Sequence, residues 1–383
     1  MLNGVRGLLL AGVLAVAGCA GTRVVSPSGA TAYEVSLAPV GERLALAWYG
    51  GGLAHAALWL RFADARGRPI GAAQPLTDGL REAYEPELQA VGDRLAVAWY
   101  EKDPADGTLS AWLALIDERG NVLWRRQLSN AGQEGRSAIV RSAGEQLLAL
   151  WIERAPGEAP AVWMARLDAA GNVTDPARRI AAAGDSTWLL NAAVDASDTL
   201  YVVYDAALGS RASELQLLSV TGAQVTATRL TPDDGIDSTY PDIAIDGNRV
   251  AIAWTDSVRG AHAVYLAAGE LSAWPPETLP AIRASSGGDA GGAYLAWNGD
   301  RLALAWHETA AGRTSVRARL YSSRGQPLGR TALLSGRAAR ALVPDIRRWR
   351  QGFAIAWNAF AFRSGDASVA VLTPWVPTVR GIR

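Results

Sequence analysis

Residues 302–306 read LALAW, and this alternation of aliphatic side chains ending in an aromatic residue decides the fold. Related blocks recur along the chain, with their aromatic residues 50–53 positions apart. The copies are LALAW at 44–48, LAVAW at 95–99, LLALW at 147–151, LYVVY at 200–204, VAIAW at 250–254, LALAW at 302–306 and FAIAW at 353–357. Periods of 20–50 residues are typical of repeat architectures, so seven similar units should make up most of the chain.

Each unit contains the signals of two hairpins. Turn sequences such as GDR at 92–94 and DGN at 246–248 precede the block, and DxxG follows a second apolar run at 64–67, 117–120 and 168–171. Glycine in such turns supplies the backbone freedom that a tight hairpin requires. We therefore expect four antiparallel strands in each unit.

Four strands repeated seven times predict an all-β, seven-bladed β-propeller of four-stranded antiparallel blades over residues 30–383. The block strand is apolar on both faces, as expected for a strand packed between two neighbouring blades. Two separate β-sandwiches are the alternative, but they give no reason for an even sevenfold repeat. Residues 24–26 precede Trp48 by the offset at which Leu76 precedes Trp99. We therefore expect the strand around Val24 to pair with the last unit and close the ring.

The N-terminal residues predict a cleaved signal peptide over residues 1–18. A short basic start and an apolar stretch lead into VAGC at 16–19, and Cys19 is the only cysteine of the chain. This motif resembles the lipobox of bacterial lipoproteins. The resemblance implies that Cys19 carries acyl chains such as palmitate, with residues 19–29 as a short tether or closing strand. A plain signal peptide with a chance cysteine is the alternative reading.

The lipoprotein resemblance also implies a location in the cell envelope, because several acyl chains hold a protein stably at a membrane. Asp after the acylated cysteine favours the inner membrane in that family, whereas this chain has Ala20. We therefore expect an outer-membrane protein that faces the periplasm, with a membrane as one partner and an envelope protein or glycan as the other. We expect the propeller to be monomeric.

Composition excludes several classes of function. The chain has 37 basic and 37 acidic residues, so it lacks the net positive charge that draws a protein to nucleic acid. One cysteine permits no intrachain disulfide. The three histidines occupy different places in the repeat, so we expect no metal site. We also expect no cofactor and no catalytic residue set, because the usual catalytic motifs are absent.

The candidate ligand-binding face is the one with the longer, varied loops, which join the second strand to the third and each unit to the next. Acidic residues recur there two positions after the block aromatic or at the start of the first strand, with aromatic residues and one histidine nearby. The candidates are Glu87, Glu101, Glu153, Asp242, Asp256, His307, Glu308, Tyr84, Trp188 and Tyr240. The alternative is that the acids are solvated strand-end charges and the rings fill gaps between blades.

The stretch YPDIAIDGNRVAIAWTD at 240–256 resembles the repeats of sialidase-type propellers. The Asp-box of that family, SxDxGxTW, is absent from this chain. The leading hypothesis is a membrane-anchored lipoprotein that acts as a non-enzymatic binding or scaffold propeller for a protein, peptide or glycan. The resemblance implies the alternative, a glycan-active hydrolase or lyase of sialidase-like propeller type.

Overall fold

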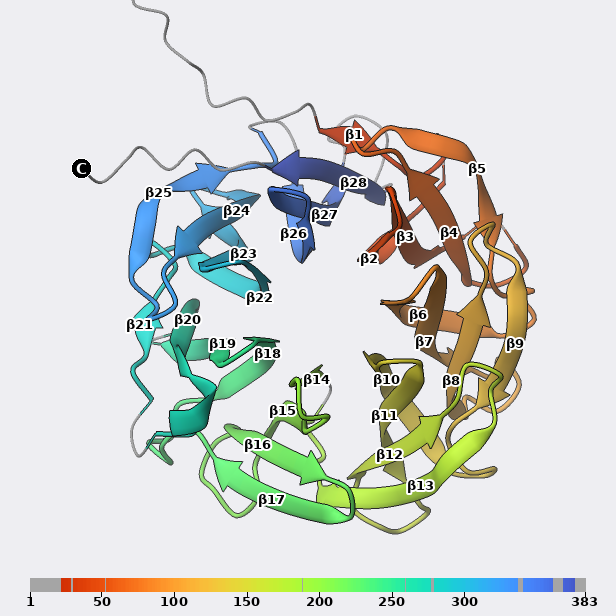
Figure 1. The fold of residues 1–383 in the computed structure, drawn as a ribbon, viewed down its shortest axis with the longest axis horizontal. Helices are drawn as coiled ribbons and strands as arrows, with labels where there is room; N and C mark the ends of the chain where they lie inside the picture. The colour runs from red at the N-terminus through yellow and green to blue at the C-terminus, as the bar shows by residue number, and fades with distance from the viewer. Residues whose placement is uncertain are drawn as a thin grey trace, which may run out of the picture.

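The computed structural model describes residues 22–28, 30–51, 53–187, 189–258, 260–276, 279–336, 340–360 and 368–375. Its strands form seven four-stranded sheets arranged around a central axis (Figure 1). Every strand pairing within these sheets is antiparallel, and each sheet contains one copy of the repeated block. The predicted all-β propeller of four-stranded antiparallel blades is confirmed.

The first three blades run in chain order from the innermost strand to the outermost strand. Blade 1 holds β2 (Tyr33–Val40), β3 (Arg43–Gly50), β4 (Ala57–Ala63) and β5 (Pro69–Pro75). Blade 2 holds β6 (Glu82–Val91), β7 (Arg94–Lys102), β8 (Leu109–Ile116) and β9 (Val122–Gln127). Blade 3 holds β10 (Glu134–Ala143), β11 (Gln146–Arg154), β12 (Ala161–Leu167) and β13 (Val173–Ala182).

The next three blades have the same order. Blade 4 holds β14 (Leu190–Val194), β15 (Leu200–Ala206), β16 (Glu214–Thr221) and β17 (Gln224–Arg229). Blade 5 holds β18 (Ser238–Asp246), β19 (Arg249–Val258), β20 (Ala261–Glu270) and β21 (Ile282–Arg283), with a short 3₁₀ helix at Leu271–Ala273. Blade 6 holds β22 (Asp289–Asn298), β23 (Arg301–Ala310), β24 (Arg313–Tyr321) and β25 (Pro327–Leu333).

Blade 7 joins the two ends of the chain. It holds β26 (Arg340–Trp349), β27 (Gly352–Phe360) and β28 (Ser368–Trp375), and its outer strand is β1 (Arg23–Val24). Arg23 pairs with Leu372 and Val24 with Val371. This is the closure that the sequence predicts. The signal segment and Cys19 lie outside the described residues.

The hydrophobic core lies between the blades. The second strand of each blade is almost wholly buried, as β11 and β27 illustrate, whereas outer strands such as β9 are mainly exposed. Each hydrophobic cluster joins two neighbouring blades, including blade 7 with blade 1. Burial on both faces explains why the block is apolar throughout.

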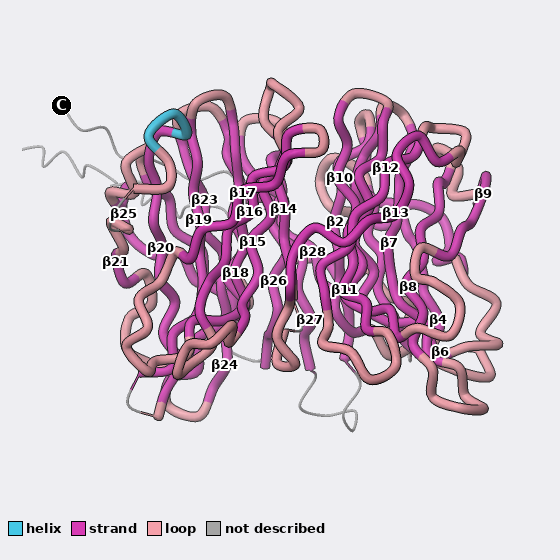
Figure 2. Tube along the Cα trace, turned by 90° about the horizontal axis from the view of Figure 1, so that it is seen from below, coloured by secondary structure: helices cyan, strands magenta, loops and turns pink. Residues whose placement is uncertain are grey.

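Seen from the side, the strands run between two rims of loops (Figure 2). The predicted DxxG turns close the outer hairpins of blades 1, 2 and 3. In the first of them, the Asp64 carboxylate accepts hydrogen bonds from the backbone N–H groups of Arg66 and Arg68, and Gly67 has a φ of 74°. The backbone hydrogen bond to Arg68 is the main reason why the pKa of Asp64 lies below its ordinary value. These aspartates therefore stabilise turns and lie apart from the central axis.

Candidate binding cavity

A repeated irregularity in the innermost strands shapes the centre of the ring. The first strand of every blade except blade 4 shifts register near its start, by a β-bulge. The bulged residues have positive φ values of 45–58° and are Glu34, Glu85, Ser137, Tyr240, Gly292 and Val343. A left-handed conformation costs about 1–3 kcal/mol for a residue other than glycine, and such residues cluster at functional sites.

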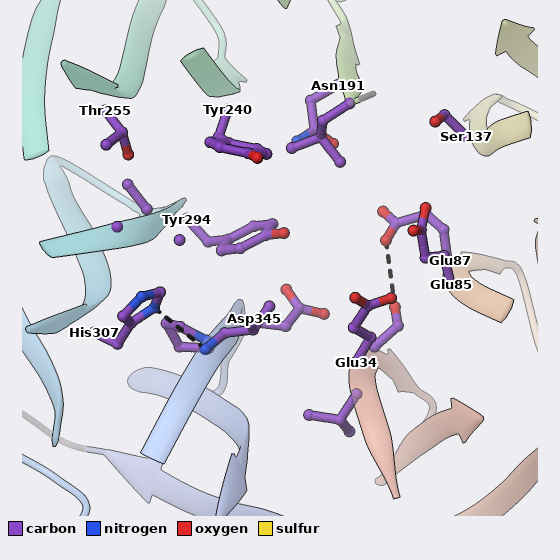
Figure 3. A pocket seen from close by; sticks show the side chains of 18 of the residues that line it. Glu34, Glu85, Glu87, Ser137, Asn191, Tyr240, Thr255, Tyr294, His307 and Asp345 are labelled. Carbon is purple, nitrogen blue, oxygen red and sulfur yellow. Dashed lines mark hydrogen bonds between the residues drawn. The ribbon is translucent and has the colours of Figure 1, made fainter. Parts of the chain in front are cut away.

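The bulged residues and their neighbours enclose a cavity of about 460 Å³ in the central channel (Figure 3). This volume lies within the usual range for small-molecule sites. The cavity lies where the innermost strands begin, so it opens towards the face with the inter-blade loops. All seven blades contribute to its lining. The cavity therefore opens on the face that the sequence analysis gives as the candidate ligand-binding face.

A network of paired charges fills the floor of the cavity. Glu87 Oε1 accepts hydrogen bonds from Arg141 Nη1 at 2.9 Å and from Arg347 Nη2 at 3.3 Å. Arg347 Nη1 also donates to Asp345 Oδ1 at 2.5 Å. These charges come from blades 2, 3 and 7, so the network joins distant parts of the ring. Buried charges that are paired in this way have their cost of desolvation offset.

The floor acids also connect neighbouring blades through backbone groups. Asp345 Oδ2 accepts a hydrogen bond from the Leu37 N–H at 2.7 Å, and Asp242 Oδ2 accepts one from the Leu295 N–H at 2.7 Å. Burial raises the pKa of Asp345 to about 7 and that of Asp242 to about 6, with the nearby arginine charges opposing the rise. The floor acids therefore have a structural role, because their carboxyl oxygens already accept hydrogen bonds from the protein.

Glu34 and Glu85 form a second acidic group, on the wall of the cavity. They occupy equivalent bulges in blades 1 and 2. Tyr100 donates its hydroxyl hydrogen to Glu85 Oε1 at 3.3 Å, whereas Glu34 Oε2 is buried without a hydrogen-bond partner. Neither carboxyl group forms an ion pair within the described part of the chain. We call these two side chains the acid pair.

Burial is the main cause of a raised pKa in both members of the acid pair. The neighbouring Glu85 charge raises the pKa of Glu34 further. For Glu85, the Tyr100 hydrogen bond and the Arg136 charge offset only part of the rise. Two close carboxyl groups in a poorly solvated site resist ionising together. The acid pair therefore retains protons near neutral pH.

A row of tyrosines packs beside the acid pair. Ring centroids are 5.4 Å apart for Tyr33 and Tyr49, 5.1 Å for Tyr49 and Tyr84, and 5.5 Å for Tyr84 and Tyr100. Burial, followed by the Glu34 and Glu85 charges, raises the pKa of Tyr49, so its phenol stays neutral. The row therefore spans the interface between blades 1 and 2.

The opposite wall carries hydroxyl, aromatic and imidazole groups. Tyr240 is 52% exposed, and Tyr294 lies beside it (Figure 3). Thr255 is only 2% exposed, lines the cavity, and its Oγ1 has no hydrogen-bond partner. Burial lowers the pKa of His307 to about 4, and its Nδ1 accepts a hydrogen bond from the Val343 N–H at 3.4 Å. His307 is therefore neutral at pH 7.

Three of the sequence-predicted site residues line this cavity, and a fourth lies in its floor. Glu87, Tyr240 and His307 are lining residues. Asp242 is buried beside the Arg347 and Arg141 charges. Tyr84 belongs to the tyrosine row, and Trp188 lies outside the described residues.

The candidate acids two positions after the block tryptophan do not line the cavity. Each accepts a hydrogen bond from the indole N–H of the tryptophan two residues before it, at 2.7–3.0 Å. These acids are Glu101, Glu153, Asp256 and Glu308. Residues i and i+2 of a strand share a face, so they pack with the tryptophan between blades. We call these four tryptophan–carboxylate contacts the indole clamps.

The same alternation explains which residues the sequence reasoning missed. The residue directly after the tryptophan points to the other face of the strand, and in blades 5 and 6 this residue is Thr255 or His307. Glu34 and Glu85 each stand 14 residues before a block tryptophan. Aligning the seven units at this offset would have shown that Glu34 and Glu85 occupy equivalent positions. Nothing in the sequence, however, indicates that a β-bulge occurs there.

The described residues contain no group of three or more His, Cys, Asp or Glu side chains that could hold a metal ion. Over the same residues, no helix is long and apolar enough to cross a membrane.

Comparison with known proteins identifies the fold alone. No family model matches the chain, and no curated protein matches it. Among solved structures, polysaccharide lyase Uly1 is 8% identical with a TM-score of 0.57, and the match covers 90% of both chains. The β-propeller domain of the trilobed protease from Pyrococcus furiosus is 10% identical with a TM-score of 0.56, covering 91% of this chain and 97% of that one.

A third similar structure is the phage phi92 endosialidase, at 10% identity and a TM-score of 0.53, covering 95% of this chain and 70% of that chain. The three similar structures are a polysaccharide lyase, a domain of a protease and an endosialidase. A shared fold does not imply a shared function, so the cavity itself has to supply the functional argument.

Proposed function

We propose that the central cavity binds a carbohydrate, and that the protein acts as a non-enzymatic binding protein of the cell envelope. The exposed ring of Tyr240 carries the proposal, because a flat aromatic face beside polar groups suits the stacking and hydrogen bonding of a sugar. The cavity volume fits a small ligand, and carboxyl and hydroxyl groups stand on opposite walls.

Binding to a panel of immobilised mono- and disaccharides, before and after Tyr240→Ala, tests this proposal. Loss of the stacking face should weaken binding of the best ligand about 10-fold. Tyr201→Ala is the matched control, because Tyr201 is a half-buried tyrosine of β15 outside the cavity lining. Equal binding by both variants, or no binding by the wild type, would overturn the proposal.

Glycan cleavage is a second candidate, and the acid pair is the observation that favours it. Glycosidases use two carboxyl groups, one of them protonated by virtue of a raised pKa. Glu34 and Glu85 have raised pKa values in a shared cavity. Release of reducing ends from envelope polysaccharides, abolished by Glu34→Gln and by Glu85→Gln separately, would establish this activity. Binding without release would favour the binding protein.

We also propose anchoring through Cys19, which the sequence motif supports. Cells fed an alkyne-labelled palmitate should label the wild type, and Cys19→Ser should lose the label and leave the membrane fraction. Unlabelled wild-type protein would contradict the anchor. The carbohydrate test is independent of this result, because it uses purified protein that starts after the signal segment.

A further inference from the structure

We propose that the carbohydrate carries a primary amine, and that this ammonium group lies between Glu34 and Glu85 while a ring hydroxyl bonds Thr255. The inference rests on the proposed carbohydrate-binding function and specifies the chemical class of the ligand as an amino sugar. It follows from which polar groups of the cavity have partners and which do not.

Most acids of the cavity have a positively charged or basic partner. Glu87 bonds Arg141 and Arg347, and Asp345 bonds Arg347. Asp289 Oδ1 lies 2.9 Å from His262 Nδ1 and also accepts the His262 backbone N–H. These groups are compensated without a ligand.

The acid pair differs, because among the described residues no cationic side chain bonds it directly, and the Arg136 charge acts on Glu85 without an ion pair. Glu34 Oε2 is buried and lacks a hydrogen-bond donor, and the hydrogen bond to Glu85 comes from the neutral Tyr100. Tyr33, Tyr49 and Tyr84 pack around the pair, and Arg136 bonds Glu134 Oε1 and the Thr187 carbonyl. A buried acceptor without a donor costs about 1–3 kcal/mol, and an ammonium group supplies three donors and a positive charge.

The backbone at the acid pair reinforces this interpretation. Glu34 and Glu85 have φ values of 46° and 50°, a conformation that non-glycine residues adopt at an energetic cost. The bulge places both side chains on the cavity wall, where each faces its counterpart on the neighbouring blade (Figure 3). Two carboxyl groups without a third ligand suit an ammonium ion better than a metal ion.

Thr255 supplies an independent sign of a ligand on the opposite wall. Its side chain is buried, yet its hydroxyl has no partner although it lines the cavity. Tyr240 lies between this hydroxyl and the middle of the channel (Figure 3). A hydroxylated ring stacked on Tyr240 would have its amine towards one wall and a hydroxyl towards the other. An amino sugar combines these two groups in one small molecule.

Calorimetric titration of the purified chain with glucosamine, glucose and N-acetylglucosamine at pH 7 tests the inference. Glucosamine should bind at least about 10-fold more tightly than the other two, because its ammonium group is a charged donor and its positive charge favours the ionised form of the acid pair. Raising the salt concentration should weaken binding of glucosamine more than binding of glucose. This comparison uses the wild-type protein, so it does not depend on whether a variant folds.

Variants then locate the ammonium group. Glu34→Gln with Glu85→Gln should reduce glucosamine affinity about 10-fold or more, a larger loss than for glucose, whereas Thr255→Val should weaken both sugars to a similar extent. Glu145→Gln is the control, because Glu145 is exposed in a hairpin turn on the other face.

Three results would overturn the inference. Equal affinity for the three sugars would end the amine assignment but leave carbohydrate binding standing. Tight binding of N-acetylglucosamine alone would likewise end the amine assignment and leave carbohydrate binding standing. Binding of none of the three, by protein with a native circular dichroism spectrum, would count against the amino sugar, while the wider saccharide panel decides whether carbohydrate binding also fails.

Discussion

Glu308, one of the four indole-clamp acids, and Glu34 of the acid pair are both buried carboxyl groups, but they have opposite electrostatic environments. Glu308 accepts hydrogen bonds from Trp306 Nε1 at 3.0 Å and from Ser286 Oγ at 2.5 Å. Burial by itself would raise the pKa of Glu308, but the hydrogen bonds outweigh this effect and hold the pKa below its ordinary value. Glu34 has a buried oxygen without a donor, and burial raises its pKa.

The difference teaches which buried acids serve the fold. A carboxylate whose oxygens all have donors is stabilised as an anion and strengthens the structure around it. Glu101 Oε2 also lacks a donor but lies outside the cavity lining, whereas Glu34 Oε2 lacks one at the cavity wall, where a ligand can supply it. Glu308 therefore belongs to a blade interface, and we assign the acid pair to the site.

Breaking an indole clamp should have the largest effect. Glu308→Ala removes the acceptor of Trp306 Nε1 and of Ser286 in a position that is 1% exposed. It should lower the free energy of unfolding by about 3–5 kcal/mol, because buried donors lose a charged partner. Urea unfolding at pH 7 measures the change, with Glu145→Ala as a control. A loss below about 1 kcal/mol would show that Glu308 does not stabilise the interface.

The acid pair should make stability depend on pH in the opposite sense to an ordinary acid. Its raised pKa means that the folded state keeps protons that the unfolded state has lost, so stability falls as the pH rises from the ordinary carboxyl pKa to the raised value. Asp345, with a pKa raised to about 7, acts in the same direction. His307 acts in the opposite direction, but only below its ordinary pKa of about 6.5.

Between about pH 6.5 and 8.5 we therefore expect the free energy of unfolding to decrease by about 2 kcal/mol. Urea midpoints across this range provide the measurement. The decrease should shrink in the variant with Glu34→Gln and Glu85→Gln. Stability that rises with pH over this interval would contradict the protonated state of the acid pair.

Removing one member of the acid pair should have a smaller effect, of the opposite sign to Glu308→Ala. Ionisation of the buried Glu34 carboxyl group costs free energy at pH 8. Glu34→Gln replaces this group with a neutral one of the same shape. It should raise the free energy of unfolding by about 1 kcal/mol. Thermal melts of the variant and wild type at pH 8 check this, and a clear destabilisation would place Glu34 among the structural acids.

Thr255→Val should have the smallest effect on stability. Its hydroxyl has no hydrogen-bond partner, so an isosteric apolar side chain should change the free energy of unfolding by less than about 0.5 kcal/mol or slightly raise it. The same urea titration measures this change. A loss above about 1 kcal/mol would mean that the hydroxyl has a structural partner and is not kept for a ligand.

The cavity could be predicted from the sequence only in part. Glu87, Tyr240 and His307 line it, because the start of the first strand and the end of the second strand meet in antiparallel pairing. Glu101 and Glu153 do not line the cavity. An acid that recurs in the repeat can pack between blades as readily as it can bind a ligand. Both face the tryptophan of their own strand.

The sequence by itself determined the repeat, the four strands of each unit and the closing strand at Val24. Hydrophobic alternation and turn glycines are local signals, and repetition multiplies them. Only the tertiary structure decided that Glu34 and Glu85 meet and that Thr255 lacks a partner. The bulges depend on how neighbouring strands pair, and the pKa values depend on which groups seven separate blades bring together around one channel.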